Sequence, residues 1–133
     1  TMDSTTRSVI DRITSRFDTA QEVPGGHRCS VVYDTALLNP NDLARLAADA
    51  TGHLDHELFD VTVGVAYSGI LFASAVAGGR QVAILREDGS FFGPSITGKR
   101  VLVVDDVVFS GSRLSRAAGA VGAAGAEVVG FAC

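Results

Sequence analysis

The sequence has no tryptophan, only three prolines and two cysteines, and no run of basic residues. Cys29 and Cys133 are far apart and form no Cys-x-x-Cys pair, which argues against a disulfide framework and a zinc site. The net charge of −4 argues against nonspecific nucleic-acid binding as the main role. No apolar run reaches the roughly 18 residues that a membrane span needs, and no signal peptide is visible. We therefore expect a soluble, cytoplasmic protein with no nucleic-acid or membrane partner.

The chain does contain enough apolar material for one core. Hydrophobic residues make up 47% of the 133 residues and charged residues 20%. This length suffices for one domain but not for two. We predict a single domain over residues 1–133.

The stretch Val101–Gly111 is the most informative part of the chain. Its first four residues are apolar, which is typical of a strand covered on both faces. Asp105 and Asp106 follow directly, and helical spacing of small apolar residues begins after Ser112. The segment between them therefore lies at the carboxyl end of a strand and the start of a helix, where open α/β sheets bind ligands.

This segment predicts a binding site for a phosphorylated sugar. Backbone N–H groups at a helix start, close approach at Gly111 and the hydroxyls of Ser110 and Ser112 form a cradle for a phosphate. Asp105 and Asp106 would repel a phosphate unless they faced another part of the ligand. Carboxylates suit vicinal sugar hydroxyls or a Mg²⁺ ion with its waters, so a phosphorylated ribose satisfies both halves.

The remaining pattern predicts an α/β fold with a single doubly wound, mainly parallel sheet and helices on both faces. We expect helices from Ser4 or Asp3 to about Phe17, from Pro40 with Asn39 as cap, from about Gly69 to Gly78, and after Ser112. We expect strands over 29–34, 61–66, 81–85, 99–104 and 126–132, and loops over 21–26 and 87–97.

The letters V-L-V-V-D-D-V-V-F-S-G-S-R resemble the phosphoribosyl-pyrophosphate-binding signature of type I phosphoribosyltransferases. The resemblance implies that Asp105 and Asp106 are catalytic residues that fix the ribose and contact Mg²⁺ indirectly, through water or ligand. It also implies that the loop residues Ser110, Gly111, Ser112 and Arg113 bind the 5′-phosphate, and that Val108 and Phe109 are substrate-binding residues. An unrelated nucleotide-binding domain is a weaker alternative, because the chain has neither a Gly-x-x-x-x-Gly-Lys loop nor a Gly-x-Gly-x-x-Gly turn.

Two further stretches resemble the orotate phosphoribosyltransferase branch of this family. Residues 28–34 resemble the N-terminal hood that lies over the base, which implies base contacts for Arg28 and Tyr33. Residues 63–70 resemble the pyrophosphate-binding loop, which implies that the backbone N–H groups of Ala66, Tyr67, Ser68 and Gly69 face the pyrophosphate. Within the single domain, we expect the N-terminal helices and hood to span residues 1–58 and the core sheet to span residues 59–133.

The chain departs from that branch where positive charge is expected. Lysines and a histidine normally neutralise the leaving pyrophosphate, whereas the loop here offers Arg86 beside Glu87 and Asp88. Arg86 is thus the catalytic candidate in this loop. Arg113 replaces a usual Ser or Thr, and two alternatives stay open for it: a contact to the 5′-phosphate or exposure to solvent.

The resemblance implies a Mg²⁺-dependent enzyme that moves the 5-phosphoribosyl group from phosphoribosyl pyrophosphate to a nitrogenous, pyrimidine-like base and releases pyrophosphate. Orotate is one candidate base. The alternative is a catalytically weak regulatory relative that binds phosphoribosyl pyrophosphate or a nucleotide. By resemblance alone, we expect a homodimer.

Overall fold

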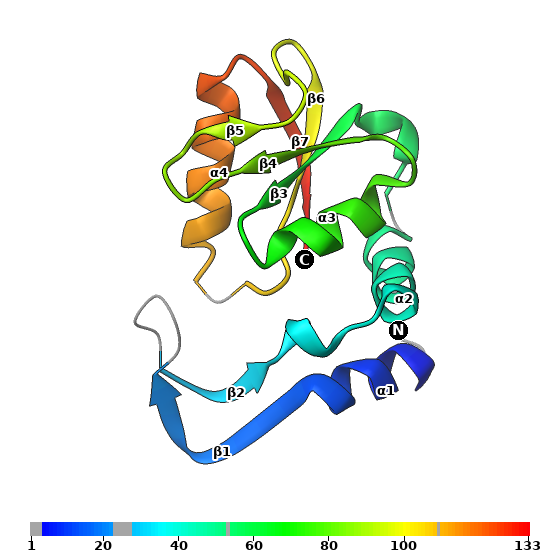
Figure 1. Cartoon of the computed structure of the whole chain (residues 1–133), viewed down its shortest axis with the longest axis vertical. Coiled ribbons are helices and arrows are strands. Elements are labelled where there is room, and N and C mark those ends of the chain that lie inside the picture. The colour runs from blue at the N-terminus through cyan, green and yellow to red at the C-terminus, as the bar shows by residue number, and fades with distance from the viewer. Residues whose placement is uncertain (1–3, 23–27, 53, 109) are drawn as a thin grey trace.

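The core of the protein is a five-stranded sheet in the order β5-β4-β3-β6-β7 (Figure 1). The computed structural model describes residues 4–22, 28–52, 54–108 and 110–133. Four of the strands are parallel and β5 is antiparallel to β4. The strands are β3 (Val61–Val65), β4 (Gln81–Leu85), β5 (Phe91–Phe92), β6 (Arg100–Val104) and β7 (Glu127–Ala132).

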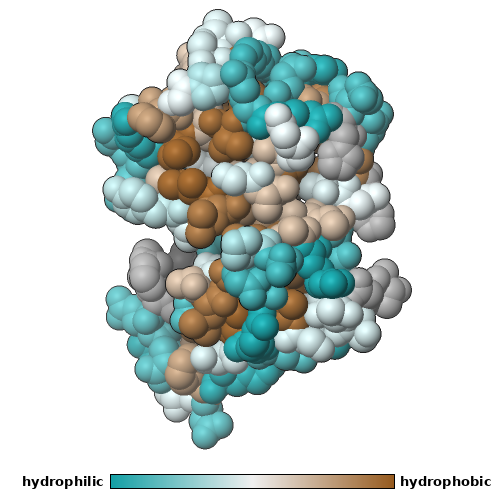
Figure 2. All heavy atoms as spheres, turned by 45° about the vertical axis from the view of Figure 1, so that its right-hand side comes forward, coloured by the Kyte–Doolittle hydropathy of each residue, from teal (hydrophilic) through white to brown (hydrophobic). Residues whose placement is uncertain are grey.

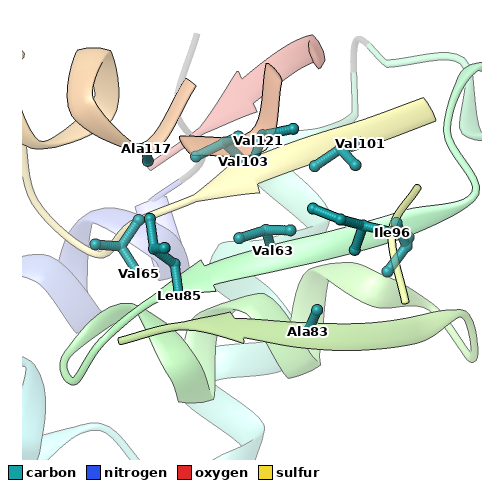
Figure 3. Packing of buried hydrophobic residues seen from close by; sticks show 10 residues of the cluster. Val63, Val65, Ala83, Leu85, Ile96, Val101, Val103, Ala117 and Val121 are labelled. Atoms are coloured by element: carbon teal, nitrogen blue, oxygen red, sulfur yellow. The ribbon is translucent and has the colours of Figure 1, made fainter. Parts of the chain in front are cut away.

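Helices cover both faces of this sheet. One face packs against α4 (Ser112–Ala123), and the other against α2 (Pro40–Thr51) and α3 (Gly69–Ala77). Strand β6 contributes to both cores. Val101 and Val103 point to the first face (Figure 3). Leu102 and Val104 belong to the core on the second face. This alternation explains the unbroken apolar run and confirms the predicted doubly wound sheet.

The helix boundaries follow the local capping chemistry. Asn39 and Asp42 form a complete capping box at the start of α2: the Asn39 side chain accepts from the Asp42 N–H at 2.9 Å, and the Asp42 carboxylate accepts from the Asn39 N–H at 3.1 Å. Helix α3 ends at Gly78, whose φ of 58° lies in the left-handed region. None of the described helices combines the length and apolar character needed to cross a bilayer.

The N-terminal part differs from the prediction. Helix α1 (Ser4–Ile13) ends four residues before Phe17, and β1 (Thr14–Glu22) then pairs antiparallel with β2 (Arg28–Tyr33). The predicted helical end and part of the predicted loop over 21–26 are therefore wrong; its remaining residues lie outside the described part of the chain. Pairing with β2 holds residues 14–22 extended, and a bond from the Asp34 N–H to the Ile13 carbonyl (2.9 Å) continues the pairing to the end of α1. Phe17 stays 41% exposed.

The predicted loop over 87–97 also contains structure. Phe91 and Phe92 form β5, which pairs with the end of β4 through a hairpin closed by the Arg86 N–H and the Ser90 carbonyl at 2.8 Å. Gly89, with φ of 86°, supplies the left-handed residue that this short turn needs.

The space-filling view shows apolar side chains gathered over both the upper, core part and the lower, N-terminal part of the molecule (Figure 2).

Candidate functional site

A cleft of about 680 Å³ lies where the parallel strands β3, β4 and β6 end. This is the edge at which open α/β sheets bind ligands. Predicted site residues from four separate segments come together there. They are Tyr67 and Ser68 after β3, Arg86 after β4, Asp105 and Val108 after β6, and Ser110, Gly111, Ser112 and Arg113 at the start of α4.

The loop before α4 has the conformation of an open helix start. Gly111 is the residue before the helix, its φ is 83°, and no side chain caps the helix. The Ser110 hydroxyl accepts from the Ser112 N–H at 3.3 Å and donates to the Ser112 hydroxyl at 3.0 Å. The positive end of the α4 dipole therefore faces the cleft with hydroxyl groups beside it.

The loop after β3 carries a second uncapped helix start. Ser68 precedes α3 and its side chain makes no capping bond. The Ala66 N–H, however, donates to the Leu85 carbonyl at 2.9 Å. The expectation that it faces a pyrophosphate is therefore wrong, and the candidate donors are Tyr67, Ser68 and Gly69.

Gly69 does not line the cleft. Its role is to let the loop after β3 lie close to the end of β6. A Cβ atom at this position would lie 2.9 Å from the Val104 carbonyl oxygen and 3.1 Å from the Cα of Asp105. The first distance is shorter than real Cβ contacts and the second is tighter than most of them, so a side chain here would push the loops apart. Gly69 thus fixes the spacing between the ends of β3 and β6.

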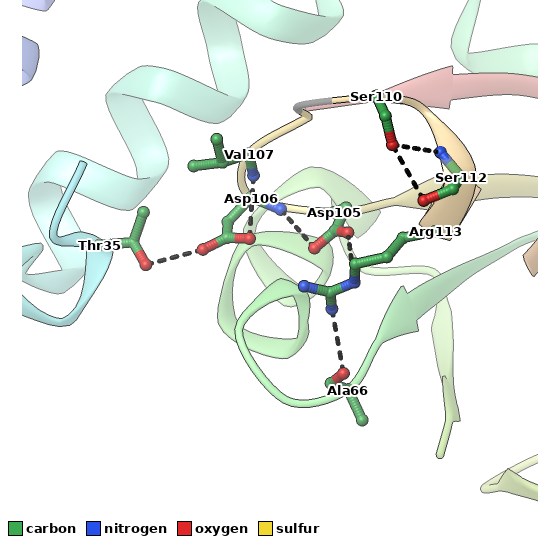
Figure 4. Close-up of polar contacts among 8 residues, drawn as sticks. All are labelled: Thr35, Ala66, Asp105, Asp106, Val107, Ser110, Ser112 and Arg113. Atoms are coloured by element: carbon green, nitrogen blue, oxygen red, sulfur yellow. Dashed lines mark hydrogen bonds and ion pairs between the residues drawn. The ribbon is translucent and has the colours of Figure 1, made fainter. Parts of the chain in front are cut away.

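Asp105 lies beneath the floor of the cleft with no exposed surface. Its Oδ1 accepts from the Asp106 N–H at 2.9 Å, and its Oδ2 lies 3.3 Å from Nε of Arg113 but has no hydrogen-bond partner (Figure 4). Burial, with a smaller contribution from a hydrogen bond to Asp106, raises the pKa of Asp105 to about 6. The expectation that Asp105 presents an open carboxylate to a sugar is therefore not met in this conformation, because Arg113 covers it.

Asp106 is half-buried and turned toward the N-terminal part of the chain. Its Oδ2 accepts from the Thr35 hydroxyl at 2.8 Å, and its Oδ1 accepts from the Val107 N–H at 2.9 Å. Burial favours the protonated form, but hydrogen bonds from Thr35, Asp105 and Ser68 outweigh it and lower the pKa of Asp106. Sequence reasoning missed Thr35, since it lies 71 positions away and belongs to no motif.

Arg113 is partly exposed and is also held by contacts within the protein, while its contact to a 5′-phosphate stays a prediction. Its Nη2 donates to the Ala66 carbonyl at 3.1 Å, and its Nε pairs with Asp105, as Figure 4 shows. The side chain is 47% exposed and lines the cleft. Arg113 therefore connects the start of α4 to the ends of β3 and β6.

Two other arginines line the cleft. Arg86 is anchored in the β4–β5 hairpin, where its Nη1 donates to the Ser90 hydroxyl at 3.4 Å and its guanidinium lies 5.2 Å from the centre of the Phe92 ring. Arg116 was not predicted from the sequence. The available signal was its spacing, because a residue three positions after Arg113 lies on the same face of the helix.

Other predicted site residues lie elsewhere. Arg28 donates to the Ala20 carbonyl at 2.8 Å, Tyr33 is 40% exposed on β2, and neither lines the cleft, so the structure does not bring these hood residues to the site. Phe109 lies outside the described residues. Among the described residues, no three acidic, histidine or cysteine side chains cluster as metal ligands. Asp105 and Asp106 supply carboxylate oxygens, which are the donors that Mg²⁺ takes, and indirect contact to Mg²⁺ through water or ligand stays a prediction.

Comparison with known proteins shows what this chain is similar to. Residues 92–133 match the phosphoribosyl transferase domain. The chain is 36% identical to orotate phosphoribosyltransferase of Stenotrophomonas maltophilia (strain K279a), over 55% of this chain and 40% of that protein. It is 29% identical to that of Nocardioides sp. (strain ATCC BAA-499 / JS614), over 100% of this chain and 79% of that protein.

A solved structure shares the fold. Orotate phosphoribosyltransferase of Mycobacterium tuberculosis H37Rv, in complex with 5-phospho-alpha-D-ribosyl 1-diphosphate, superposes with a TM-score of 0.71 at 24% identity, covering 96% of this chain and 78% of that chain. The matched region spans 40% to 55% of the length of several relatives. The fold is that of the type I phosphoribosyltransferases, and the resemblance to their orotate branch is confirmed.

Proposed function

We propose that this chain binds phosphoribosyl pyrophosphate and transfers its 5-phosphoribosyl group to a nitrogenous, pyrimidine-like base, for which orotate is one candidate. The observation that carries the proposal is the cleft itself. Asp105 and the Ser110-Gly111-Ser112 loop of the signature line this cleft, and two uncapped helix starts lie beside them. Asp106 follows Asp105 directly but is not among the lining residues, since its side chain turns toward Thr35. Similarity to orotate phosphoribosyltransferases, one of them solved with this donor, supports the same conclusion.

The helix ends support an anionic ligand. Helix α2 satisfies its own start with a capping box, whereas α3 and α4 leave theirs without side-chain caps. Each open start carries roughly half a positive charge from the aligned peptide dipoles. We assign the 5′-phosphate to the α4 start and the pyrophosphate to the α3 start, as in the resemblance described above.

The ribose is assigned to the acids at the end of β6. Asp106 is the stronger candidate, because its lowered pKa keeps it charged and its carboxylate oxygens retain acceptor capacity beyond the bonds to Thr35 and Val107. Mg²⁺ bound to the donor would neutralise charge on the pyrophosphate. Asp105 and Asp106 would hold its waters rather than the ion itself.

The main role of the protein in this reaction is to position the reacting groups. A ring nitrogen of the base attacks C1 of the ribose as the bond from C1 to the pyrophosphate oxygen breaks, and the electron pair of that bond leaves with pyrophosphate. The ring nitrogen gives up its N–H proton to solvent water. Fixing the sugar and phosphate groups brings the reacting atoms together, and aligned N–H groups stabilise the charge that develops on the leaving group.

A binding protein without efficient catalysis is the second candidate. Glu87 lines the cleft beside Arg86, and Arg86 is held by Ser90 and Phe92 in the hairpin. A leaving pyrophosphate would meet little free positive charge from this loop. This arrangement favours binding over turnover.

The test combines calorimetry with a turnover assay. Phosphoribosyl pyrophosphate is titrated into the protein at constant Mg²⁺, and pyrophosphate release is then followed with orotate, uracil and other bases. Binding with release on one base supports the transferase, and binding without release on any base supports the regulatory candidate. Absence of binding would overturn both. The homodimer stays a prediction, which sedimentation velocity tests.

A further inference from the structure

Arg113 is held in place by two different parts of the core. Its Nη2 donates to the Ala66 carbonyl at the end of β3, and its Nε lies 3.3 Å from Oδ2 of Asp105 at the end of β6. Asp105 is fully buried, and this oxygen has no hydrogen-bond partner, so the guanidinium supplies its compensating charge. The contacts fix a cation beside the loop to which we assign the pyrophosphate.

The guanidinium keeps donors for a ligand. Arginine carries five N–H donors, and the contacts to Ala66 and Asp105 engage two of its nitrogens with one N–H each. About three donors therefore remain on a side chain that is 47% exposed and lines the cleft. A planar guanidinium held in one orientation suits two parallel hydrogen bonds to phosphate oxygens.

The other cationic side chains are less suited to this position. Within the described residues, the basic side chains that line the cleft are Arg86, Arg113 and Arg116. Arg86 is engaged with Ser90 and Phe92. Arg116 lies one helical turn further along α4, whereas Arg113 hydrogen-bonds directly to the β3 loop.

We propose that Arg113, oriented by Asp105 and the Ala66 carbonyl, binds the pyrophosphate group of phosphoribosyl pyrophosphate. It thereby replaces positive charge that the acidic segment 86–93 does not provide. This inference rests on the proposed function, and it makes Arg113 a determinant of donor binding rather than of base recognition. Asp105 acts in it as a positioning residue.

Calorimetry with three probes at constant Mg²⁺ tests the assignment: phosphoribosyl pyrophosphate, inorganic pyrophosphate and ribose 5-phosphate. We expect Arg113→Ala to weaken the first two by about tenfold to hundredfold, which is the usual effect of losing charge-assisted hydrogen bonds. Binding of ribose 5-phosphate should change by less than about threefold. Equal weakening of all three probes, or unchanged binding of phosphoribosyl pyrophosphate, would overturn the proposal.

Two further variants make the result interpretable. Because Arg113→Ala leaves a buried carboxylate unpaired, the same substitution is also compared in an Asp105→Asn background, where the neutral amide removes that problem. Arg45→Ala, on the exposed side of α2, removes one positive charge that does not line the cleft and should leave all three affinities unchanged. If Arg45→Ala weakened binding as much as Arg113→Ala does, the effect would come from net charge alone, and the proposal would be contradicted.

The outcomes also separate this inference from the proposed function. If the wild-type protein binds none of the probes, the proposed function fails and this inference fails with it. If the wild type binds phosphoribosyl pyrophosphate and Arg113→Ala binds it equally well, only the role of Arg113 is contradicted.

Discussion

The buried carboxyl group of Asp105 should make the stability of this protein depend on pH in an unusual direction. Its pKa rises from an ordinary 3.8 to about 6 in the folded chain, chiefly because burial penalises the charged form. The folded state therefore binds a proton more tightly than the unfolded state. The resulting stabilisation is fully present below about pH 4 and is lost as the pH rises through about 6.

The size of the effect follows from the pKa. Each pKa unit corresponds to about 1.4 kcal/mol, so the rise from 3.8 to about 6 amounts to ~3 kcal/mol at most. Asp105→Asn removes the titration while keeping the shape of the side chain. We expect the free energy of unfolding of the variant, relative to the wild type, to increase by up to ~3 kcal/mol between pH 4 and pH 7.5.

The assay is urea unfolding followed by far-ultraviolet circular dichroism at several pH values from 4 to 8. Asp60→Asn provides a control whose difference from the wild type should stay constant over this range, because hydrogen bonds from Arg100 lower the pKa of Asp60 to about 2. The stability that Asp60 contributes is present above about pH 4 and declines as the pH falls toward 2. If the difference between Asp105→Asn and the wild type stays constant within about 0.5 kcal/mol across the range, the assigned environment of Asp105 is wrong.

Two further substitutions test the packing around the site. Gly69→Ala should lower the free energy of unfolding by about 1–3 kcal/mol, because the new Cβ meets backbone atoms of Val104 and Asp105. The matched change Gly119→Ala has open space on α4 and should raise stability by about 0.5–1 kcal/mol, so similar effects of the two in urea unfolding would contradict the close approach. Thr35→Val should cost about 1.5–3 kcal/mol, since it removes a hydrogen bond to the charged Asp106, and an unchanged urea midpoint would mean that this contact does not form in solution.

Much of the core could be predicted because its signals are local. The four apolar residues Val101–Val104 required a strand covered on both faces, and the residues after them marked the end of the strand at which the cleft lies. Asn39 and Pro40 fixed the start of α2, and Gly78 fixed the end of α3, because capping depends on a few neighbouring residues.

The features that could not be predicted depend on contacts between distant residues. Strand β1 forms because β2 is available to pair with it, although the spacing of its apolar residues suggested a helix. The burial of Asp105 and its pairing with Arg113 depend on how three strand ends converge. The bond from Thr35 to Asp106 joins residues with no sequence relationship.

The most direct test of the central claim is a crystal structure of the protein with phosphoribosyl pyrophosphate and Mg²⁺. The account predicts the 5′-phosphate at the backbone N–H groups of residues 111–113, the ribose hydroxyls beside Asp106, and the pyrophosphate between Ser68 and Arg113. Ligand density outside this cleft, or a reversed ligand with the pyrophosphate at the start of α4, would contradict it.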